Sequence, residues 1–269
     1  MLQVEHLIQR VKAYQPSVDS ELIQRAYDYS FRMHAGQTRK SGQPYIVHPV
    51  GVAGILADLR LDAASVCAGL LHDVVEDTLA TTDEIQKEFG TEVAELVDGV
   101  TKLSKINFTS KEDRQAENFR KMVVAMARDI RVLLIKLCDR LDNMRTLEHM
   151  NGEAQERIAR ETLEIYAPLA NRLGIQAFKS ELEDLSFKHL EPDAQADLVA
   201  QMTKTKRERD KYITEVCKTL SSRLAEQGLR PRSRAARSTS TASTGRCRRS
   251  SRASRACTIS SRSASSSRA

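Results

Sequence analysis

The chain has 269 residues, of which 41% are hydrophobic, so it can bury a substantial core in one domain or two. Its formal net charge of +6 is unevenly distributed. Eleven arginines and no acid lie in residues 229–269, which leaves 31 bases against 36 acids in residues 1–228. The polar first residues and the absence of an apolar run near the roughly 20 residues that cross a bilayer argue against a signal peptide or membrane span. With no C-x-x-C pair among the five cysteines, we expect a reduced, cytoplasmic protein with no membrane partner.

Helical periodicity runs nearly throughout from Val4 to about Leu190, and no alternating strand pattern of useful length interrupts it. In the first half we predict helices over residues 20–33, 48–59, 63–77, 83–89 and 92–103. In the second half we predict helices over residues 112–127, 129–146, 153–173, 176–189 and 193–227, and we expect the third of these to be bent or ended around Pro168 and Gly174. Capping residues support several starts, notably Asp19, Asp62 and the pair Thr81 and Glu84. The body is therefore predicted to be all-α, with a long C-terminal helix.

Residues 37–45 separate the first two of these helices and carry the adjacent cations Arg39 and Lys40. Gly42 and Pro44 indicate a loop. A basic surface turn and a phosphate-contacting loop both fit this composition.

The stretch from Leu70 to Thr78 places His72 and three carboxylates within six positions, with no lysine or arginine among them. Such carboxylates repel one another beside an imidazole unless a cation lies between them. This pattern favours a divalent metal site, and a plain acidic helix end is the alternative. Gly69 inside the same predicted helix costs about 1 kcal/mol relative to alanine, which indicates close approach by another helix or a ligand.

Residues 229–269 consist mainly of arginine, serine, alanine and threonine, so we expect no folded core there and predict a disordered tail. Our preferred interpretation is out-of-frame translation of a GC-rich coding sequence. A basic nucleic-acid-binding arm is less favoured, because the segment has no aromatic residues for stacking.

Polar residues that interrupt apolar helices suggest which side chains could meet. His48 lies at a helix start, His72 and Asp73 within a helix, and Asp139 where the most apolar helix becomes polar. Two imidazoles and two carboxylates suit Mn²⁺ or Fe²⁺. Taken singly, each histidine could instead be a hydrogen-bonded residue, and Asp139 could form an ion pair with Arg140 or Arg145. Taken together, the order H, HD and a distant D is that of HD-type phosphohydrolases.

Five blocks in register make the resemblance more specific. They are residues 39–49, 72–78 (HDVVEDT), 99–103, 139–147 (DRLDNMRTL) and 166–174 (YAPLANRLG). These blocks resemble the RelA/SpoT homologue family of alarmone synthetase–hydrolases, and the likeness covers about residues 1–228. The resemblance implies an HD-domain helical bundle that hydrolyses the 3′-pyrophosphate of the guanine nucleotide alarmones ppGpp and pppGpp to GDP or GTP and pyrophosphate.

The resemblance also implies a role for each matching residue. One Mn²⁺ would be held by four ligands: His48, His72, Asp73 and Asp139. Glu76 and Asp77 would orient and deprotonate the attacking water. Arg39 and Lys40 would meet the guanine face or the phosphates, and four further residues would line the nucleotide pocket: Ser41, Tyr45, Asn143 and Thr146.

The chain departs from the family pattern in two places. Many relatives carry histidine where this chain has Asp142, and we expect little effect on the metal from that change. The second departure is the absence of a synthetase domain, which gives an expected organisation of a hydrolase domain over residues 1–190, connecting helices over 191–228 and the tail over 229–269. The alternatives are an HD phosphohydrolase for another nucleotide and a truncated, non-catalytic alarmone-binding or regulatory fragment. No specific nucleic-acid partner is expected, and the oligomeric state stays open.

Overall fold

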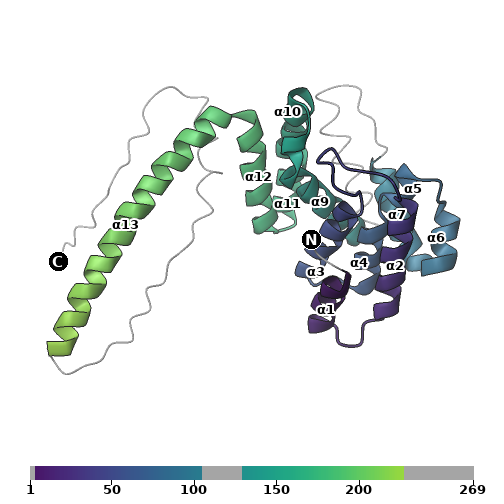
Figure 1. Cartoon of the computed structure of the whole chain (residues 1–269), viewed down its shortest axis with the longest axis horizontal. Coiled ribbons are helices and arrows are strands. Elements are labelled where there is room, and N and C mark those ends of the chain that lie inside the picture. The colour runs from purple at the N-terminus through teal and green to yellow at the C-terminus, as the bar shows by residue number, and fades with distance from the viewer. Residues whose placement is uncertain (1–3, 105–128, 227–269) are drawn as a thin grey trace, which may run out of the picture. The chain divides into compact units, whose positions relative to one another are not determined.

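The computed structural model describes residues 4–104 and 129–226, and this part is all-helical apart from an isolated bridge between Thr38 and Pro44 (Figure 1). The all-α prediction is confirmed. The chain divides into two compact units, Met1–Tyr212 and Ile213–Ala269. The predicted helix over residues 112–127 and the predicted tail over residues 229–269 lie outside the described residues.

The first helices begin at side chains that satisfy exposed backbone N–H groups. After α1 (Val4–Tyr14), helix α2 (Ser20–Met33) starts at Asp19, whose carboxylate accepts from the Leu22 N–H at 3.0 Å. Helix α3 (Val47–Asp58) follows the 37–45 loop, and α4 (Ala63–Leu71) starts where Asp62 accepts from the Ser65 N–H at 2.8 Å. Both N-cap predictions are confirmed.

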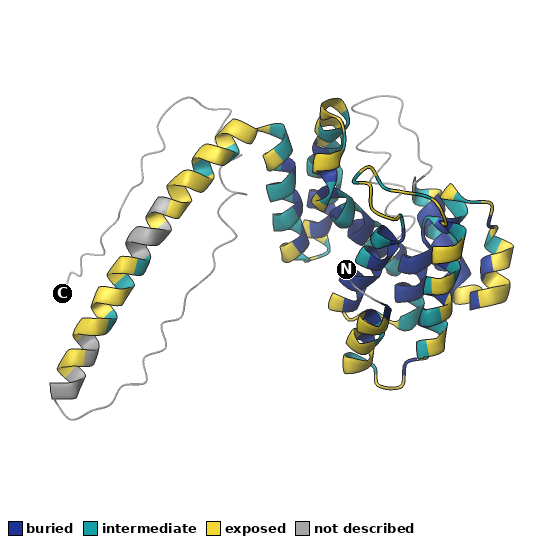
Figure 2. Cartoon of the chain, in the orientation of Figure 1, coloured by how far each residue is buried: buried dark blue, intermediate teal, exposed yellow. Residues whose placement is uncertain are grey.

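Helix α4 forms the centre of the core. Its residues from Ser65 to Leu71 are all buried, and it packs against α2, α3, α7 and α9 (Figure 2). A Cβ at Gly69 would collide with the Leu56 side chain and lie 3.6 Å from the backbone of Ala53 on α3. The predicted close approach at Gly69 is therefore helix–helix packing.

The acidic stretch does not continue α4. The helix ends at Leu71, and a separate short helix α5 (Val74–Asp77) follows, so the prediction of one helix over residues 63–77 is wrong. The imidazole Nδ1 of His72 lies 2.8 Å from the Gly69 carbonyl oxygen, which is the acceptor that the Asp73 N–H would use in a continuing helix. The chain thus turns at His72 and Asp73.

Helices α6 (Thr82–Phe89) and α7 (Thr91–Ser104) pack against each other, and α7 contacts α4 and α9. Thr81 and Glu84 form the predicted capping box, and Gly90 ends α6 with a φ of 87°. Helix α9 (Ile130–Arg145) begins at Asp129 and lies against α3, α4 and α7. It carries much of the remaining core on its buried face.

The helices after α9 form a second cluster, and α12 makes the main contact of this cluster with α9. They are η1 (Leu147–His149), α10 (Gly152–Glu161), the π-helical turn η2 (Thr162–Tyr166), α11 (Ala167–Arg172) and α12 (Gln176–Leu190). The predicted helix over residues 153–173 is thus divided by a wide turn just before Pro168. Helix α13 (Pro192–Glu226) is exposed along much of its length (Figure 2). Within the described residues, no helix has the length and apolar character needed to cross a membrane.

Candidate metal centre

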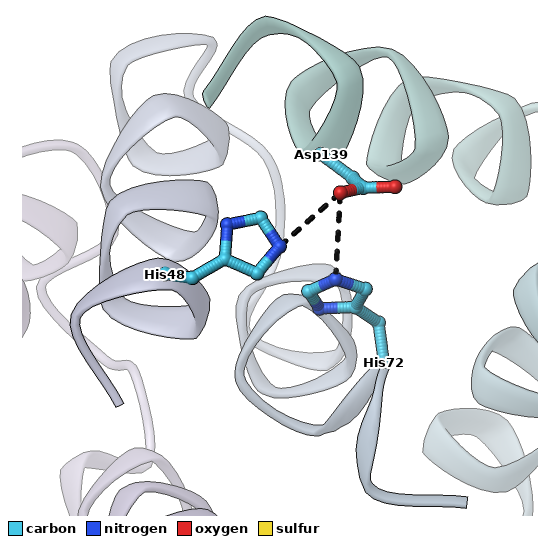
Figure 3. Close-up of side chains that lie close together, drawn as sticks. All are labelled: His48, His72 and Asp139. Atoms are coloured by element: carbon cyan, nitrogen blue, oxygen red, sulfur yellow. Dashed lines mark ion pairs between the residues drawn. The ribbon is translucent and has the colours of Figure 1, made fainter. Parts of the chain in front are cut away.

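Three buried side chains from separate helices converge in the core. His48 comes from the first turn of α3, His72 from the turn after α4, and Asp139 from α9. One ligand atom from each lies within 4.8 Å of the others, and both rings face the same carboxylate (Figure 3). The Nε2 atoms of His48 and His72 lie 3.2 Å and 3.8 Å from Asp139 Oδ1.

The backbone around His72 determines which ring nitrogen faces this group. A carbonyl oxygen only accepts, so Nδ1 carries a proton and donates to Gly69. Nε2 is then left with its lone pair directed at the carboxylates. It is fully buried and makes no hydrogen bond, although Asp73 Oδ1 lies 3.0 Å away. A cation between imidazole and carboxylates would satisfy both, so the donor set fits a divalent metal.

His48 has the same orientation with a different partner. Its Nδ1 lies 2.6 Å from Asp142 Oδ2, while its Nε2 faces Asp139 and Asp73. Burial alone lowers the pKa of His48, but hydrogen bonds to Asp139 and Asp142 outweigh it and raise that pKa to about 9. The carboxylates around His48 therefore favour positive charge at its Nε2, from a proton or from a metal ion in its place.

Asp73 adjoins the group at the turn between α4 and α5. Its Oδ2 lies 3.5 Å from His48 Nε2 and accepts a hydrogen bond from the Tyr45 hydroxyl at 2.7 Å. The same hydroxyl lies 2.8 Å from Asp77 Oδ2. Tyr45 thus joins a predicted metal ligand to a predicted catalytic carboxylate. Glu76 lies beside Asp77 on α5.

A cavity of about 370 Å³ opens next to Asp139. Its lining includes five of the six residues predicted to bind nucleotide: Arg39, Lys40, Ser41, Asn143 and Thr146. Tyr45 is not among the lining residues. Further basic groups come from Lys136, Arg140 and Arg157, so the cavity presents cations beside the metal group.

The sequence analysis missed two residues of this site. Lys136 lies one turn before Asp139 and pairs with its Oδ2 at 2.7 Å, whereas Arg140 and Arg145 pair with Glu161 and Glu181. The alternative in which either arginine pairs with Asp139 is therefore wrong. The other residue is Asp142, which was predicted only as a departure from the family pattern with little effect on the metal, and which contacts both His48 and Arg39. Helical spacing was the available signal, since both residues lie three positions from Asp139.

The order and chemistry of these residues agree with the comparison to known families. The family model described as "HD domain" matches residues 26–176. The chain belongs to the HD-domain family. Within that family its relatives are longer proteins, and the resemblance to the hydrolase region of the RelA/SpoT proteins is confirmed.

Three curated relatives illustrate the match. A GTP pyrophosphokinase of Myxococcus xanthus is 59% identical over 223 residues, which cover 82% of this chain and 30% of the relative. A probable guanosine-3′,5′-bis(diphosphate) 3′-pyrophosphohydrolase of Synechocystis is 55% identical over 208 residues, or 77% and 27% of the two chains. The bifunctional (p)ppGpp synthase/hydrolase SpoT of Escherichia coli is 48% identical over 225 residues, or 84% and 32%. The chain thus spans about a third of the length of these relatives.

Proposed function

We propose that this HD domain uses Mn²⁺ to hydrolyse the 3′-pyrophosphate of ppGpp and pppGpp, and that it releases pyrophosphate with GDP from ppGpp and with GTP from pppGpp. The observation that supports the proposal most directly is the buried His72 Nε2, which faces Asp139 and Asp73 without a hydrogen bond beside a cation-lined cavity. We infer the substrate from the names of the Synechocystis and E. coli relatives.

The predicted ligands are His48, His72, Asp73 and Asp139. Mn²⁺, when bound, would supply a Lewis acid that lowers the pKa of water and offsets charge on the phosphoryl oxygens. The nitrogen and oxygen donors agree with Mn²⁺, and the same donors suit Fe²⁺. The donor atoms alone therefore do not distinguish Mn²⁺ from Fe²⁺, and the metal must be identified by experiment.

Glu76 and Asp77 have the predicted task of orienting and deprotonating the attacking water. Asp77 is close enough to the metal group for this role, because Tyr45 bridges it to Asp73. The cavity that Asp139 helps to line also has Arg39, Lys40 and Lys136 in its wall, where they could contact a polyphosphate. Cations in these positions neutralise the phosphates and hold the reacting bond in place.

The deciding experiment measures pyrophosphate release from ppGpp with Mn²⁺ and with a chelator. We expect Mn²⁺-dependent release that His72→Ala and Glu76→Ala each reduce at least 100-fold, which is about the scale of losing one catalytic group. Glu181→Gln, which disrupts an exposed ion pair with Arg145, is the matched control and should retain full activity. Release that survives both substitutions would reject the assignment.

A panel of nucleotides separates this proposal from its alternatives. Hydrolysis restricted to guanosine 3′-diphosphates supports alarmone turnover, and preference for another nucleotide would indicate a different HD phosphohydrolase. Binding of ppGpp without turnover would indicate a regulatory fragment. The proposed organisation places the catalytic residues within residues 1–190, followed by connecting helices over residues 191–228.

A further inference from the structure

Asp142 lies between the metal group and the loop that carries Arg39. Its Oδ2 is 2.6 Å from His48 Nδ1 and 3.0 Å from Arg39 Nη1. The Asp142 side chain is only 15% exposed, and its two partners are 3% and 16% exposed. One carboxylate therefore contacts a predicted metal ligand and a predicted nucleotide-binding cation, which come from different segments of the chain.

The contact with His48 determines which nitrogen is available to a metal. A carboxylate oxygen only accepts hydrogen bonds, so Nδ1 is protonated, and Nε2 is the nitrogen that faces Asp139 and Asp73 and could bind a metal in place of a proton. Carboxylates in this outer position fix the tautomer and ring orientation of a ligating histidine and increase its basicity. His72 instead has a neutral carbonyl, that of Gly69, in the same place. The two histidines would thus be unequal ligands.

The contact with Arg39 holds the exposed 37–45 loop. The guanidinium donates from Nη1 to Asp142 and from Nη2 to Asn143 Oδ1, the second at 2.6 Å. Within the loop, the Arg39 N–H donates to the Gln43 carbonyl and the Gly42 N–H to the Arg39 carbonyl, both at 2.9 Å. Loss of Asp142 would remove one of the two hydrogen bonds that hold the Arg39 guanidinium on α9.

The position of Asp142 also depends on a glycine in the facing helix. Gly51 lies on α3, three residues after His48, and a Cβ there would lie 3.1 Å from Asp142 Cγ and would collide with Oδ1. Glycine inside a helix costs about 1 kcal/mol relative to alanine. At this position it leaves the space in which the carboxylate lies.

We propose that Asp142 is a positioning residue that presents His48 Nε2 to the metal and anchors Arg39 toward the nucleotide, so that one side chain couples the two halves of the site. This inference rests on the proposed function for the identity of both ligands. It predicts two separable effects of removing the carboxylate, one on metal affinity and one on substrate affinity.

The test compares Asp142→Asn, Asp142→Ala and Gly51→Ala with the wild type and with Glu181→Gln, which alters another carboxylate that pairs with α9. Mn²⁺ affinity of metal-stripped protein is measured from the electron paramagnetic resonance signal of free Mn²⁺, and KM and kcat for ppGpp are measured at saturating Mn²⁺. Circular dichroism establishes that each variant is folded. Gly51→Ala matters because it displaces the carboxylate without removing its charge.

We expect both Asp142 variants to bind Mn²⁺ about 10- to 100-fold more weakly, which is the usual effect of losing such an outer partner. KM should rise severalfold even with the metal saturated, because Arg39 is no longer held. Gly51→Ala should shift both quantities in the same direction, and Glu181→Gln should change neither. A purely structural ion pair would instead lower stability and leave Mn²⁺ affinity and KM unchanged.

Mn²⁺ affinity within twofold of wild type in folded Asp142→Ala would overturn the inference, as would an unchanged KM in that variant. The metal measurement needs no turnover. A wild type that binds Mn²⁺ but releases no pyrophosphate would therefore reject the proposed function, while weaker Mn²⁺ binding by Asp142→Asn would still support the role of Asp142 at His48.

Discussion

At the scale of single residues, the Tyr45 hydroxyl has one proton and two carboxylate neighbours, Asp73 and Asp77, at 2.7 Å and 2.8 Å. Burial, together with these two carboxylates, raises the pKa of Tyr45, so the hydroxyl keeps its proton. Its ring stacks on His34 with centroids 4.4 Å apart. The ring therefore fixes the position from which the hydroxyl orients both acids.

Tyr45→Phe removes only this hydroxyl and keeps the ring contact. We expect kcat for ppGpp to fall about 10- to 100-fold with KM within twofold of wild type, because the change affects the carboxylates and not a nucleotide contact. Steady-state kinetics at saturating Mn²⁺ measures both constants. Tyr27→Phe is the control, since Tyr27 stacks on Phe31 away from the site. A higher KM with unchanged kcat would instead support the role in nucleotide binding that the resemblance implies.

Polar residues that interrupt apolar helices suggested His48, His72 and Asp139 as a group only when taken together, and the structure brings these three side chains together. The same reasoning could not assign partners to Asp142 or Lys136. Lys136 pairs with Asp139 within α9 itself, where several charged residues offered competing partners. The partners of Asp142 come from α3 and the 37–45 loop, so only the packing of those segments decides its contacts.

At the scale of secondary-structure elements, helix starts were predictable and one interruption was not. Asp19, Asp62 and Thr81 each accept from a backbone N–H three residues away, so short sequence patterns identify them. The break at His72 depends on its ring taking the Gly69 carbonyl, and hydrophobic periodicity carries no signal for that contact. The bend predicted around Pro168 is present, and the structure adds that it takes the form of a π-helical turn over Thr162–Tyr166.

Substitution of Asp62 measures how much one such N-cap contributes to the stability of the fold. Its carboxylate caps α4 at the Ser65 N–H and also accepts from Arg131 Nη1 at 2.6 Å, which ties the start of α4 to that of α9. We expect Asp62→Ala to lower the free energy of unfolding by about 1–2 kcal/mol in urea titrations at pH 7. Asp58→Ala, which removes an exposed pair with Arg10, should cost under about 0.5 kcal/mol.

The stabilisation that Asp62 provides should also depend on pH. Burial raises the pKa of Asp62, but hydrogen bonds from Ser65 and Arg131 outweigh it and lower that pKa below the ordinary aspartate value of 3.8. The stabilisation is therefore present above pH 3.8 and is lost as the pH falls through the lower folded value. The difference between wild type and Asp62→Ala should shrink in acid, and a difference that grows there would contradict this account.

At the scale of the whole molecule, the buried imidazoles and carboxylates link folding stability to pH and to metal. The pKa of His48 is about 9 in the folded protein, against an ordinary histidine value of 6.5. Burial lowers the pKa of His72, but the carboxylates of Asp73 and Asp139 outweigh it and raise that pKa too. Stabilisation from these protons is complete below pH 6.5 and is lost as the pH rises toward 9. Over this range the free energy of unfolding falls by about 1.4 kcal/mol per pH unit for each extra proton that the folded state binds.

Because a divalent ion replaces these protons, the stabilisation by Mn²⁺ should grow between about pH 6.5 and 8.5. Thermal unfolding with Mn²⁺ and with a chelator, at several pH values in this range, measures the effect. At 100 times its dissociation constant the ion would add about 2.7 kcal/mol. His48→Ala is the control and should abolish most of the dependence. A Mn²⁺ effect that is constant or smaller at higher pH would contradict the linkage.

The sequence by itself determined the all-α class, most of the helix starts and the residues of the metal group, because these depend on local patterns and on residue types with few other uses. The end of α4 at Leu71 depends on a local side-chain contact of His72 that periodicity does not signal. Only the tertiary structure decided that Tyr45 reaches two carboxylates and that Asp142 lies between His48 and Arg39. These features join segments as far as 103 positions apart in the chain. Contacts over such separations arise from the packing of whole helices, and no short stretch of sequence encodes them.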